Sequence, residues 1–266
     1  MQLDPSTCYP ALRAHDPRFD GLFFVGVKTT GIYCRPICPA RVPAADRCVF
    51  FRRAAEAERA GFRACFRCRP ELAPGVASEG SADVAPVDAI GRIVRAAVTR
   101  IEAGYLNEAS VDDLAAELGV TARHLRRAME AELGVTPIEL GQTQRLALAK
   151  QLLQETHLPL AQVAFASGFA SVRRFNALFQ ARFGRRPSDV RREHGAERKG
   201  GPEDSITLRL DYRPPFDWQE LTSFLDGRVI PGVEQILDGQ YRRSVLLGKH
   251  SGWLAVRPDP KRDALR

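Results

Sequence analysis

The sequence lacks any hydrophobic run of the roughly 18–20 residues that a membrane helix needs,. Its opening residues, MQLDPSTCYPALRAHD, also lack the apolar core of a signal peptide,. Low complexity and disorder are excluded by the composition, which is 44% hydrophobic and 27% charged over 266 residues,. We therefore expect a folded, cytoplasmic protein of one large or several small domains, with no membrane partner.

Acidic residues are the scarcer charged type. Lys and Arg number 39 against 32 Asp and Glu, which gives a net charge of +7 and a pI near 9.3. The segment Arg173–Arg192 is dense in arginine, with Asp189 as its acidic residue. Arginine suits bidentate contacts to phosphate and guanine, although its excess over lysine is also what genome composition alone can produce. The charge favours a polyanionic partner.

Cysteine is absent after residue 68, and all six cysteines precede that point. Two stretches rich in Pro, Gly, Ala and Ser, Ala73–Pro86 and His194–Ser205, have the composition of linkers,. They predict a multidomain α+β protein. We expect a small four-cysteine zinc domain over residues 1–76, an all-α domain over 86–194, and a partial α+β sheet domain over 205–266.

The middle region is helical and internally repeated. Ile90, Ile93, Val94, Val98 and Ile101 form a stripe at helical spacing that ends before Gly104, and Ser110 is placed to cap the next helix,. Leu114–Pro137 and Val163–Pro187 then share one pattern, a short apolar helix, a glycine turn and a longer helix that carries arginine. Pro137–Glu155 is expected to be the helix that joins the two units. The repeat predicts a paired helix-turn-helix.

The C-terminal region follows a different pattern. Ile206–Tyr212 alternates as a strand does, and Asp217–Leu225 is predicted to be a short helix capped by Asp217,. Val245–Leu247 and Trp253–Val256 flank a turn and are expected to form a hairpin. A small sheet with one helix follows from these signals.

The spacing of four cysteines predicts a metal site. Cys34 and Cys38 form one close pair, and Cys65 and Cys68 form a second. Each pair can reach one ion from a tight turn, and four thiolates make a tetrahedral Zn²⁺ site. The alternative, a disulfide framework, is disfavoured in a reducing cytosol. Cys8 and Cys48 have no paired partner and are expected to be free thiols.

The sequence segments around the cysteines, GIYCRPICPAR and GFRACFRCRPE, closely resemble the N-terminal domain of the Ada family of alkylation-response regulators. The resemblance covers residues 5–72 and implies repair of methyl phosphotriesters in double-stranded DNA. By that resemblance Cys34 is the acceptor that takes the methyl group irreversibly, while Cys38, Cys65 and Cys68 are the remaining ligands. Arginines beside the cysteines are candidates for holding the DNA backbone, and Arg41 matches a DNA-contacting position of the family. These arginines are Arg35, Arg41, Arg63, Arg67 and Arg69.

The segment FASGFASVRRFNALFQARFGRRPSDVR, together with the paired units, resembles the AraC/XylS family of transcription regulators over Val87–Arg192. The second helix of each unit, Thr121–Leu133 and Ala170–Phe183, would enter the major groove. The resemblance implies promoter binding, transcription activation and RNA polymerase as a partner. Leu125, Met129, Phe175, Leu178 and Phe179 are expected in the core. The DNA-reading candidates are Arg123, His124, Arg126, Arg127, Ser171, Arg173, Arg174 and Asn176.

Ile206–Pro258 resembles the opening of the AlkA-type 3-methyladenine DNA glycosylases. The base-flipping pocket and catalytic aspartate of that family lie beyond this stretch, so we expect no base excision by this chain. The leading interpretation is a single-turnover methyltransferase and transcription activator. Two alternatives stay open, namely a zinc-stabilised regulator without transfer activity, and a truncated Ada–AlkA fusion with a glycosylase name.

Overall fold

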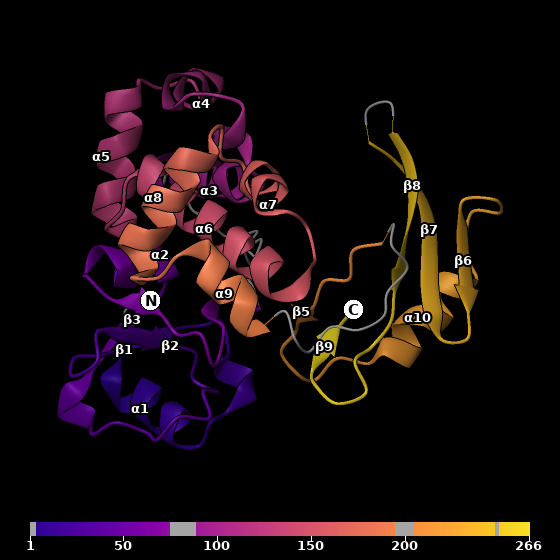
Figure 1. Ribbon diagram of the computed structural model, residues 1–266, viewed down its shortest axis with the longest axis horizontal. Helices are drawn as coiled ribbons and strands as arrows, with labels where there is room; N and C mark the ends of the chain where they lie inside the picture. The colour runs from indigo at the N-terminus through magenta and orange to yellow at the C-terminus, as the bar shows by residue number, and fades with distance from the viewer. Residues whose placement is uncertain (1–3, 75–88, 195–204, 248–249) are drawn as a thin grey trace.

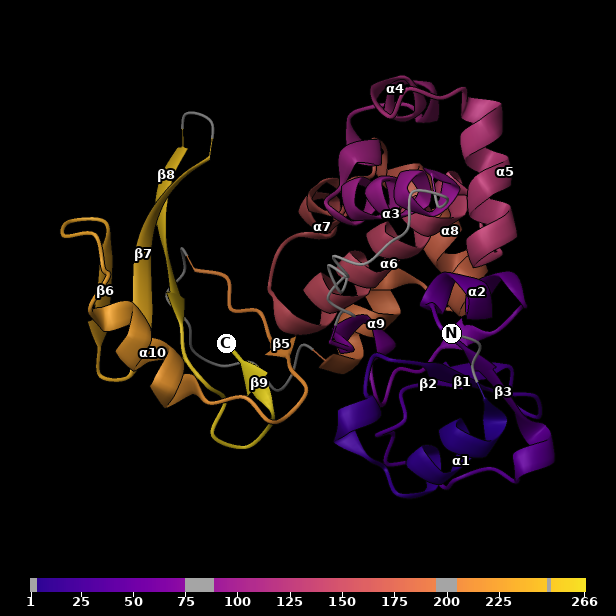
Figure 2. The same ribbon diagram turned by 180° about the vertical axis from the view of Figure 1, so that it is seen from behind.

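The protein is described here from a computed structural model, which covers residues 4–74, 89–194, 205–247 and 250–266 (Figure 1). The N-terminal sheet domain lies beneath the helical domain, and the C-terminal domain lies to one side of both, as the reverse view also shows (Figure 2). Most of the two predicted linkers falls outside the described residues. No helix in the described part of the chain has the length and apolar character needed to cross a membrane.

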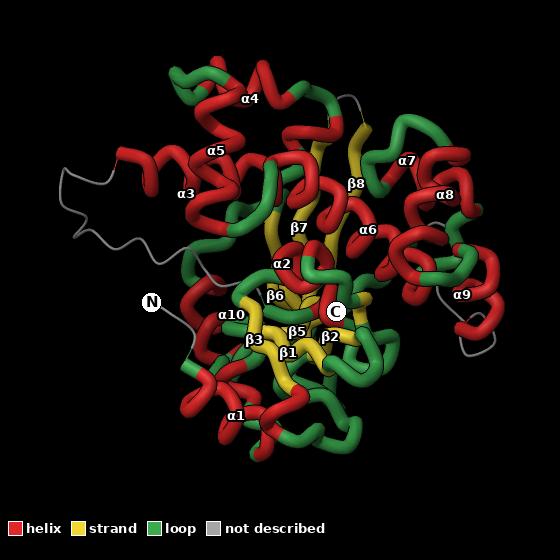
Figure 3. Tube along the Cα trace, turned by 90° about the vertical axis from the view of Figure 1, so that its left-hand side faces the viewer, coloured by secondary structure: helices red, strands yellow, loops and turns green. Residues whose placement is uncertain are grey.

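The N-terminal domain is a four-stranded sheet between two helices. Its strand order is β3-β1-β2-β4, and only β2 and β4 run parallel. Helix α1 lies on one face and α2 on the other (Figure 3). Asp4 caps α1, and its carboxylate accepts a hydrogen bond from the Ser6 backbone N–H,. The elements are α1 (Pro5–Arg13), η1 (Pro17–Phe19), β1 (Phe24–Val27), β2 (Ile32–Cys34), η2 (Ala45–Arg47), β3 (Cys48–Phe51), α2 (Ala54–Arg59), β4 (Arg63–Ala64) and η3 (Pro70–Leu72).

The alternation of side chains along β1 gives this sheet two different cores. Val25 faces α1 and the cysteines, whereas Phe24 packs on the opposite face with Tyr33,. Gly26 follows Phe24 on that second face, where a Cβ would come within 2.8 Å of the Phe51 ring. The second face is therefore packed closely enough to require glycine.

The helical domain confirms the paired helix-turn-helix. Ser110 caps α4 as expected and forms a capping box with Asp113, and Gly119 and Gly168 turn the chain in the left-handed region within each unit,. The predicted bounds of the joining helix, Pro137–Glu155, are those observed. The elements are α3 (Ala89–Glu102), η4 (Tyr105–Asn107), α4 (Val111–Glu117), α5 (Ala122–Leu133), α6 (Pro137–Glu155), α7 (Leu160–Ala166), α8 (Val172–Phe183) and α9 (Pro187–His194).

Helix α6 is the central element of the molecule. It contacts α3 and α5 of the first unit, α7 and α9 of the second, and α2 and η3 of the N-terminal domain. Leu125, Met129, Phe175 and Phe179 are fully buried around it as expected, while Leu178 is half-buried.

The C-terminal domain has the predicted helix and hairpin, but its first strand is shorter than expected. Asp217 caps α10, and β7 pairs with β8 from Tyr241 to Leu247. The alternation over Ile206–Tyr212 produces a strand at only two residues, because its partner β9 offers only two pairing residues. The elements are β5 (Leu210–Asp211), α10 (Trp218–Asp226), β6 (Glu234–Leu237), β7 (Gln240–Leu247), β8 (His250–Val256) and β9 (Ala264–Leu265).

Candidate metal centre and nucleic-acid interface

Two turns at the same end of the parallel pair β2 and β4 bring the four cysteines together. Cys34 is the last residue of β2, and a turn closed by the Cys38 N–H and the Arg35 carbonyl places Cys38 beside it. The Cys65 N–H donates to the Tyr33 carbonyl at 3.0 Å, which extends the β2–β4 pairing to the start of the second turn. The spacing prediction is confirmed, because all four Sγ atoms lie within 4.8 Å of one another.

The cluster fits a zinc ion. Four thiolates at the usual Zn–S distance of about 2.3 Å form a tetrahedron whose sulfur atoms are about 3.8 Å apart, which agrees with the observed grouping,. Each of the four cysteines is at most 9% exposed, so the site is shielded from solvent. Among the described residues no other group of three or more His, Cys, Asp or Glu side chains meets in this way.

Backbone N–H groups donate to the sulfur atoms of the second cysteine pair. The Arg35 N–H donates to Cys68 Sγ at 3.4 Å, and the Arg67 N–H donates to Cys65 Sγ at 3.3 Å. An N–H donor draws charge from a thiolate, so these two bonds lower the charge on the sulfurs of Cys68 and Cys65.

Without a metal the pKa values of the clustered cysteines are shifted in opposite directions. Hydrogen bonds with the neighbouring cysteines, and after them burial, raise the pKa of Cys34. Hydrogen bonds from the same neighbours, Cys34 first, lower the pKa of Cys65. An ion that binds all four sulfurs must displace the protons that remain, so metal affinity is expected to weaken as the pH falls.

The arginines expected near DNA separate into two groups. Arg41, Arg63 and Arg67 are exposed, so they stay candidates for contact with the DNA backbone. Arg69 is largely buried, and its guanidinium pairs with Glu71 at 3.2 Å and with Glu155 at 2.7 Å. The last member, Arg35, lies in the interior.

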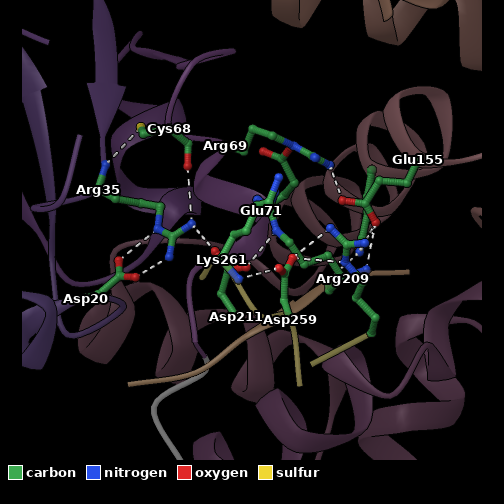
Figure 4. A network of polar contacts seen from close by, with 12 residues as sticks. Asp20, Arg35, Cys68, Arg69, Glu71, Glu155, Arg209, Asp211, Asp259 and Lys261 are labelled. Carbon is green, nitrogen blue, oxygen red and sulfur yellow. Dashed lines mark hydrogen bonds and ion pairs between the residues drawn. The ribbon is translucent and has the colours of Figure 1, made fainter. Parts of the chain in front are cut away.

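Arg35 is 2% exposed and does not face solvent, contrary to the expectation that it holds the DNA backbone. Asp20 binds its Nε and Nη2, and Asp211 of the C-terminal domain binds Nη1 at 2.7 Å (Figure 4). Burial alone would lower the pKa of Arg35, but the hydrogen bonds and charges of Asp20 and then Asp211 raise it. Both carboxylates therefore hold a permanently charged guanidinium inside the protein.

Sequence reasoning missed Lys150, a fully buried cation on α6. Its Nζ donates to the Cys65 carbonyl at 2.8 Å and to Glu71 Oε2 at 2.7 Å, and lies 4.7 Å from the centre of the Phe66 ring. A lysine in a helix is usually solvated, so only the long-range fold could identify it. Through Lys150 the helical domain touches the backbone of an expected metal ligand.

A second buried polar cluster, also missed, surrounds Glu58 of α2. Its carboxylate accepts hydrogen bonds from Tyr33 at 3.1 Å and from Thr143 at 2.6 Å, and it pairs with Arg182 of α8. Burial raises the pKa of Glu58, and the charge of Arg182 only partly offsets that effect. The cluster joins the N-terminal domain to α6 and α8.

The DNA-reading candidates all lie at the surface. Thr121 and Ser171 cap α5 and α8 respectively, and each accepts a backbone N–H three residues ahead. The side chains that follow these caps on the outer face of each helix are exposed: Arg123, His124, Arg126 and Arg127 on α5, and Arg173, Arg174 and Asn176 on α8, with Ser171 at the cap. Both helices thus present polar donors while their apolar residues face inward.

Three protein families match successive stretches of the chain. Residues 7–71 match the metal binding domain of Ada, residues 114–193 match a helix-turn-helix domain, and residues 207–266 match the AlkA N-terminal domain. All three family resemblances are thereby confirmed. The chain carries an Ada-type domain with its four-cysteine cluster, an AraC-type helix-turn-helix domain and an AlkA-type N-terminal domain.

Two curated relatives are similar over much of this chain. The "Probable bifunctional transcriptional activator/DNA repair enzyme AlkA" of Mycobacterium tuberculosis is 38% identical over 262 residues, which are 98% of this chain and 51% of the relative. The "Bifunctional transcriptional activator/DNA repair enzyme AdaA" of Bacillus subtilis is 29% identical over 69% of this chain and 81% of the relative. This chain thus spans about half the length of the Mycobacterium relative.

Among solved structures, one described as "Crystal structure of the methylated N-ADA/DNA complex" is similar to this chain. It is 30% identical, and the match covers 53% of this chain and 97% of that one with a TM-score of 0.25.

Proposed function

We propose that this chain, a homologue of the bifunctional Ada- and AlkA-type proteins, takes methyl groups from DNA methyl phosphotriesters onto Cys34 and regulates transcription through its helix-turn-helix domain. The observation that carries the proposal is the buried four-cysteine cluster, whose Sγ atoms all lie within 4.8 Å of one another. We assign the methyl acceptor to Cys34, the first cysteine of the motif in the stretch that matches the metal binding domain of Ada.

The chemistry needs a nucleophile and no proton donor. The Cys34 thiolate attacks the methyl carbon, a C–S bond forms, and the C–O bond breaks with its electron pair passing to the phosphodiester. Zinc, when bound, keeps the sulfurs deprotonated at neutral pH. In this proposal Arg41, Arg63 and Arg67, which are exposed, hold the neighbouring phosphates,. The resulting thioether is stable, so each molecule acts once.

Methyl transfer also changes the charge of the site. Four thiolates on one divalent ion carry a formal charge of −2, and methylation of one leaves −1. Less repulsion from DNA phosphates raises the affinity of the domain for DNA. A completed repair is thereby converted into tighter promoter binding.

The helix-turn-helix domain supplies sequence recognition in this proposal. Its exposed arginines on α5 and α8 contact bases and phosphates in the major groove, and activation engages RNA polymerase,. Both activities place the protein in the cytoplasm with the DNA. The segment matching AlkA is its N-terminal domain, and we assign no base excision to it.

The test is mass spectrometry of the zinc-loaded full chain after incubation with a duplex that carries one methyl phosphotriester. We expect each molecule to gain the mass of one CH2 group, located on Cys34 by peptide mapping. Cys34→Ser should abolish the gain, whereas Cys48→Ser, which changes a half-buried thiol outside the cluster, should not. No gain in a chain with zinc bound would replace the proposal with a zinc-stabilised regulator that has no transfer activity.

A further inference from the structure

A short segment of the C-terminal domain, residues 209–211, lies between the other two domains (Figure 4). On one side its main chain bonds to α6, where the Gln151 side-chain amide donates to the Arg209 carbonyl at 3.1 Å and the Arg209 N–H donates to Glu155 at 3.0 Å. On the other side Asp211 pairs with Arg35. We call this segment the interdomain strap.

Arg35 ties the two cysteine turns together. Its backbone N–H donates to Cys68 Sγ at 3.4 Å, and its Nη1 donates to the Cys68 carbonyl at 3.3 Å. The residue that follows Cys34 is therefore bonded to Cys68 through both its main chain and its side chain. The position of the guanidinium helps to set the separation of the two turns.

Asp20 and Asp211 hold different parts of that guanidinium. Asp20, within the N-terminal domain, binds Nε and Nη2. Asp211 binds Nη1, the nitrogen that also donates to the Cys68 carbonyl. The Arg209 Nε in turn donates to the other oxygen of Asp211 at 2.8 Å, which orients its carboxylate. The carboxylate that orients Nη1 thus comes from the C-terminal domain, 176 residues away in sequence.

We propose that Asp211 is a positioning residue for the four-cysteine metal centre, so that docking of the interdomain strap makes the C-terminal domain part of the metal site. Partners that orient metal ligands from outside the coordination sphere commonly change metal affinity 10–100-fold when they are lost. Asp211 acts through Arg35 rather than on a ligand directly, so its removal should lower zinc affinity roughly tenfold, at the weak end of that range.

This inference rests on the cysteine cluster binding metal, and it does not require methyl transfer. If zinc binds as expected but no methyl group reaches Cys34, the proposed function fails while the role of Asp211 stands. If methyl transfer occurs and Asp211 has no effect on zinc binding, the proposed function stands while the role of Asp211 fails. The two ideas are therefore separable by experiment.

The experiment compares full-length Asp211→Asn, Asp211→Glu and Asp226→Asn with the unmodified chain. Asp226 is an exposed residue at the end of α10, so its variant matches the charge change without touching the strap. Zinc affinity is measured by competition with a chromophoric chelator, and the Co²⁺-loaded proteins are compared by their ligand-field absorption. We expect Asp211→Asn to bind zinc roughly tenfold more weakly with shifted Co²⁺ bands, Asp211→Glu to recover part of the loss, and Asp226→Asn to be unchanged.

Equal zinc affinity and equal Co²⁺ spectra in Asp211→Asn and Asp226→Asn would overturn the proposal. If Asp211→Asn does not fold, Arg209→Met provides the second measurement, because it removes the side chain that orients Asp211 and leaves the main-chain bonds of the strap in place. A fall in the zinc affinity of Arg209→Met, smaller than the roughly tenfold fall expected for Asp211→Asn, supports the proposal. Unchanged zinc affinity in Arg209→Met contradicts it.

Discussion

The two helix-turn-helix units have one sequence pattern but different neighbours. The first unit builds its core from α3, α4 and α5, with Leu125 and Met129 at the centre and Ala55 as the buried contribution from the N-terminal domain. The second unit shares a continuous core with the N-terminal sheet, where Phe183 meets Phe66 at 5.7 Å between ring centres. One unit is thus nearly self-contained, and the other is fused to the domain that holds the cysteines.

The polar contacts follow the same division. Glu58 and Lys150 make buried bonds that link the N-terminal domain to α6 and α8. In the first unit the Arg100–Glu117 pair is exposed on both sides. A change at the metal centre therefore has a packed route to the second unit. The first unit meets the N-terminal domain through Ala55 and through the partly exposed Arg53–Glu102 pair.

The strongest test of this difference removes one buried side chain from each core. Phe183→Ala should cost about 3–5 kcal/mol, and Met129→Ala about 2–5 kcal/mol, because each leaves a cavity in a fully packed site,. Hydrogen exchange read by mass spectrometry should show loss of protection in β1 and β2 as well as α8 for Phe183→Ala. Met129→Ala should affect α3 to α5 and spare the sheet.

Loss of protection restricted to α7–α9 in the Phe183 variant would show that the shared core does not couple the two domains.

A smaller effect should come from the ionic contacts. Lys150→Met leaves Glu71 buried with Arg69 as its one remaining charged partner among the described residues. The change should cost about 3 kcal/mol, the low end for breaking a buried pair,. Arg100→Met, which breaks an exposed pair in the first unit, should cost much less, because solvent screens that pair,. Urea denaturation of the two zinc-loaded variants measures both values. Equal losses would contradict the division between a buried and an exposed set of contacts.

The smallest effect concerns pH and Glu58. Burial raises the pKa of Glu58 in the folded protein above its usual value of about 4.3, so the folded state binds the carboxyl proton more tightly than the unfolded state does,. Glu58 therefore contributes less to stability as the pH rises from the unfolded pKa through the folded one. The free energy of unfolding of Glu58→Gln minus that of the unmodified chain should therefore be larger at pH 7 than at pH 5,.

Urea titrations of both proteins across that interval measure this dependence. A difference between them that does not change with pH would show that Glu58 titrates normally in the folded chain.

Local signals predicted the helices and the metal ligands well, because each depends on neighbours in sequence. Thr136, Pro137 and Glu139 specify the start of α6, and the cysteine spacing specifies the ligand set. Helix α8 begins two residues later than expected, since Ser171 caps it from outside,. The strand expected over Ile206–Tyr212 is shorter, because the length of a strand depends on its partner.

The contacts between domains were not predictable from the sequence. Arg35 stands beside Cys34 and has the pattern of a DNA-binding arginine, and only the fold brings Asp20 and Asp211 to it. Lys150 was equally unpredictable, because its acceptors, the Cys65 carbonyl and the Glu71 carboxylate, belong to another domain. A charged residue alone does not reveal whether its partner is solvent, DNA or a distant carboxylate.

Helix α6 has a consequence for how such a sequence can change over generations. Ten of its 19 residues are buried, and Leu152, Leu153 and Gln154 are buried in succession, so partners surround the helix. A substitution there meets another domain on almost any side, whereas one on the outer face of α5 meets solvent. The exposed faces of α5 and α8 can therefore accept substitutions freely, while α6 holds its residues and keeps its contacts with all three domains.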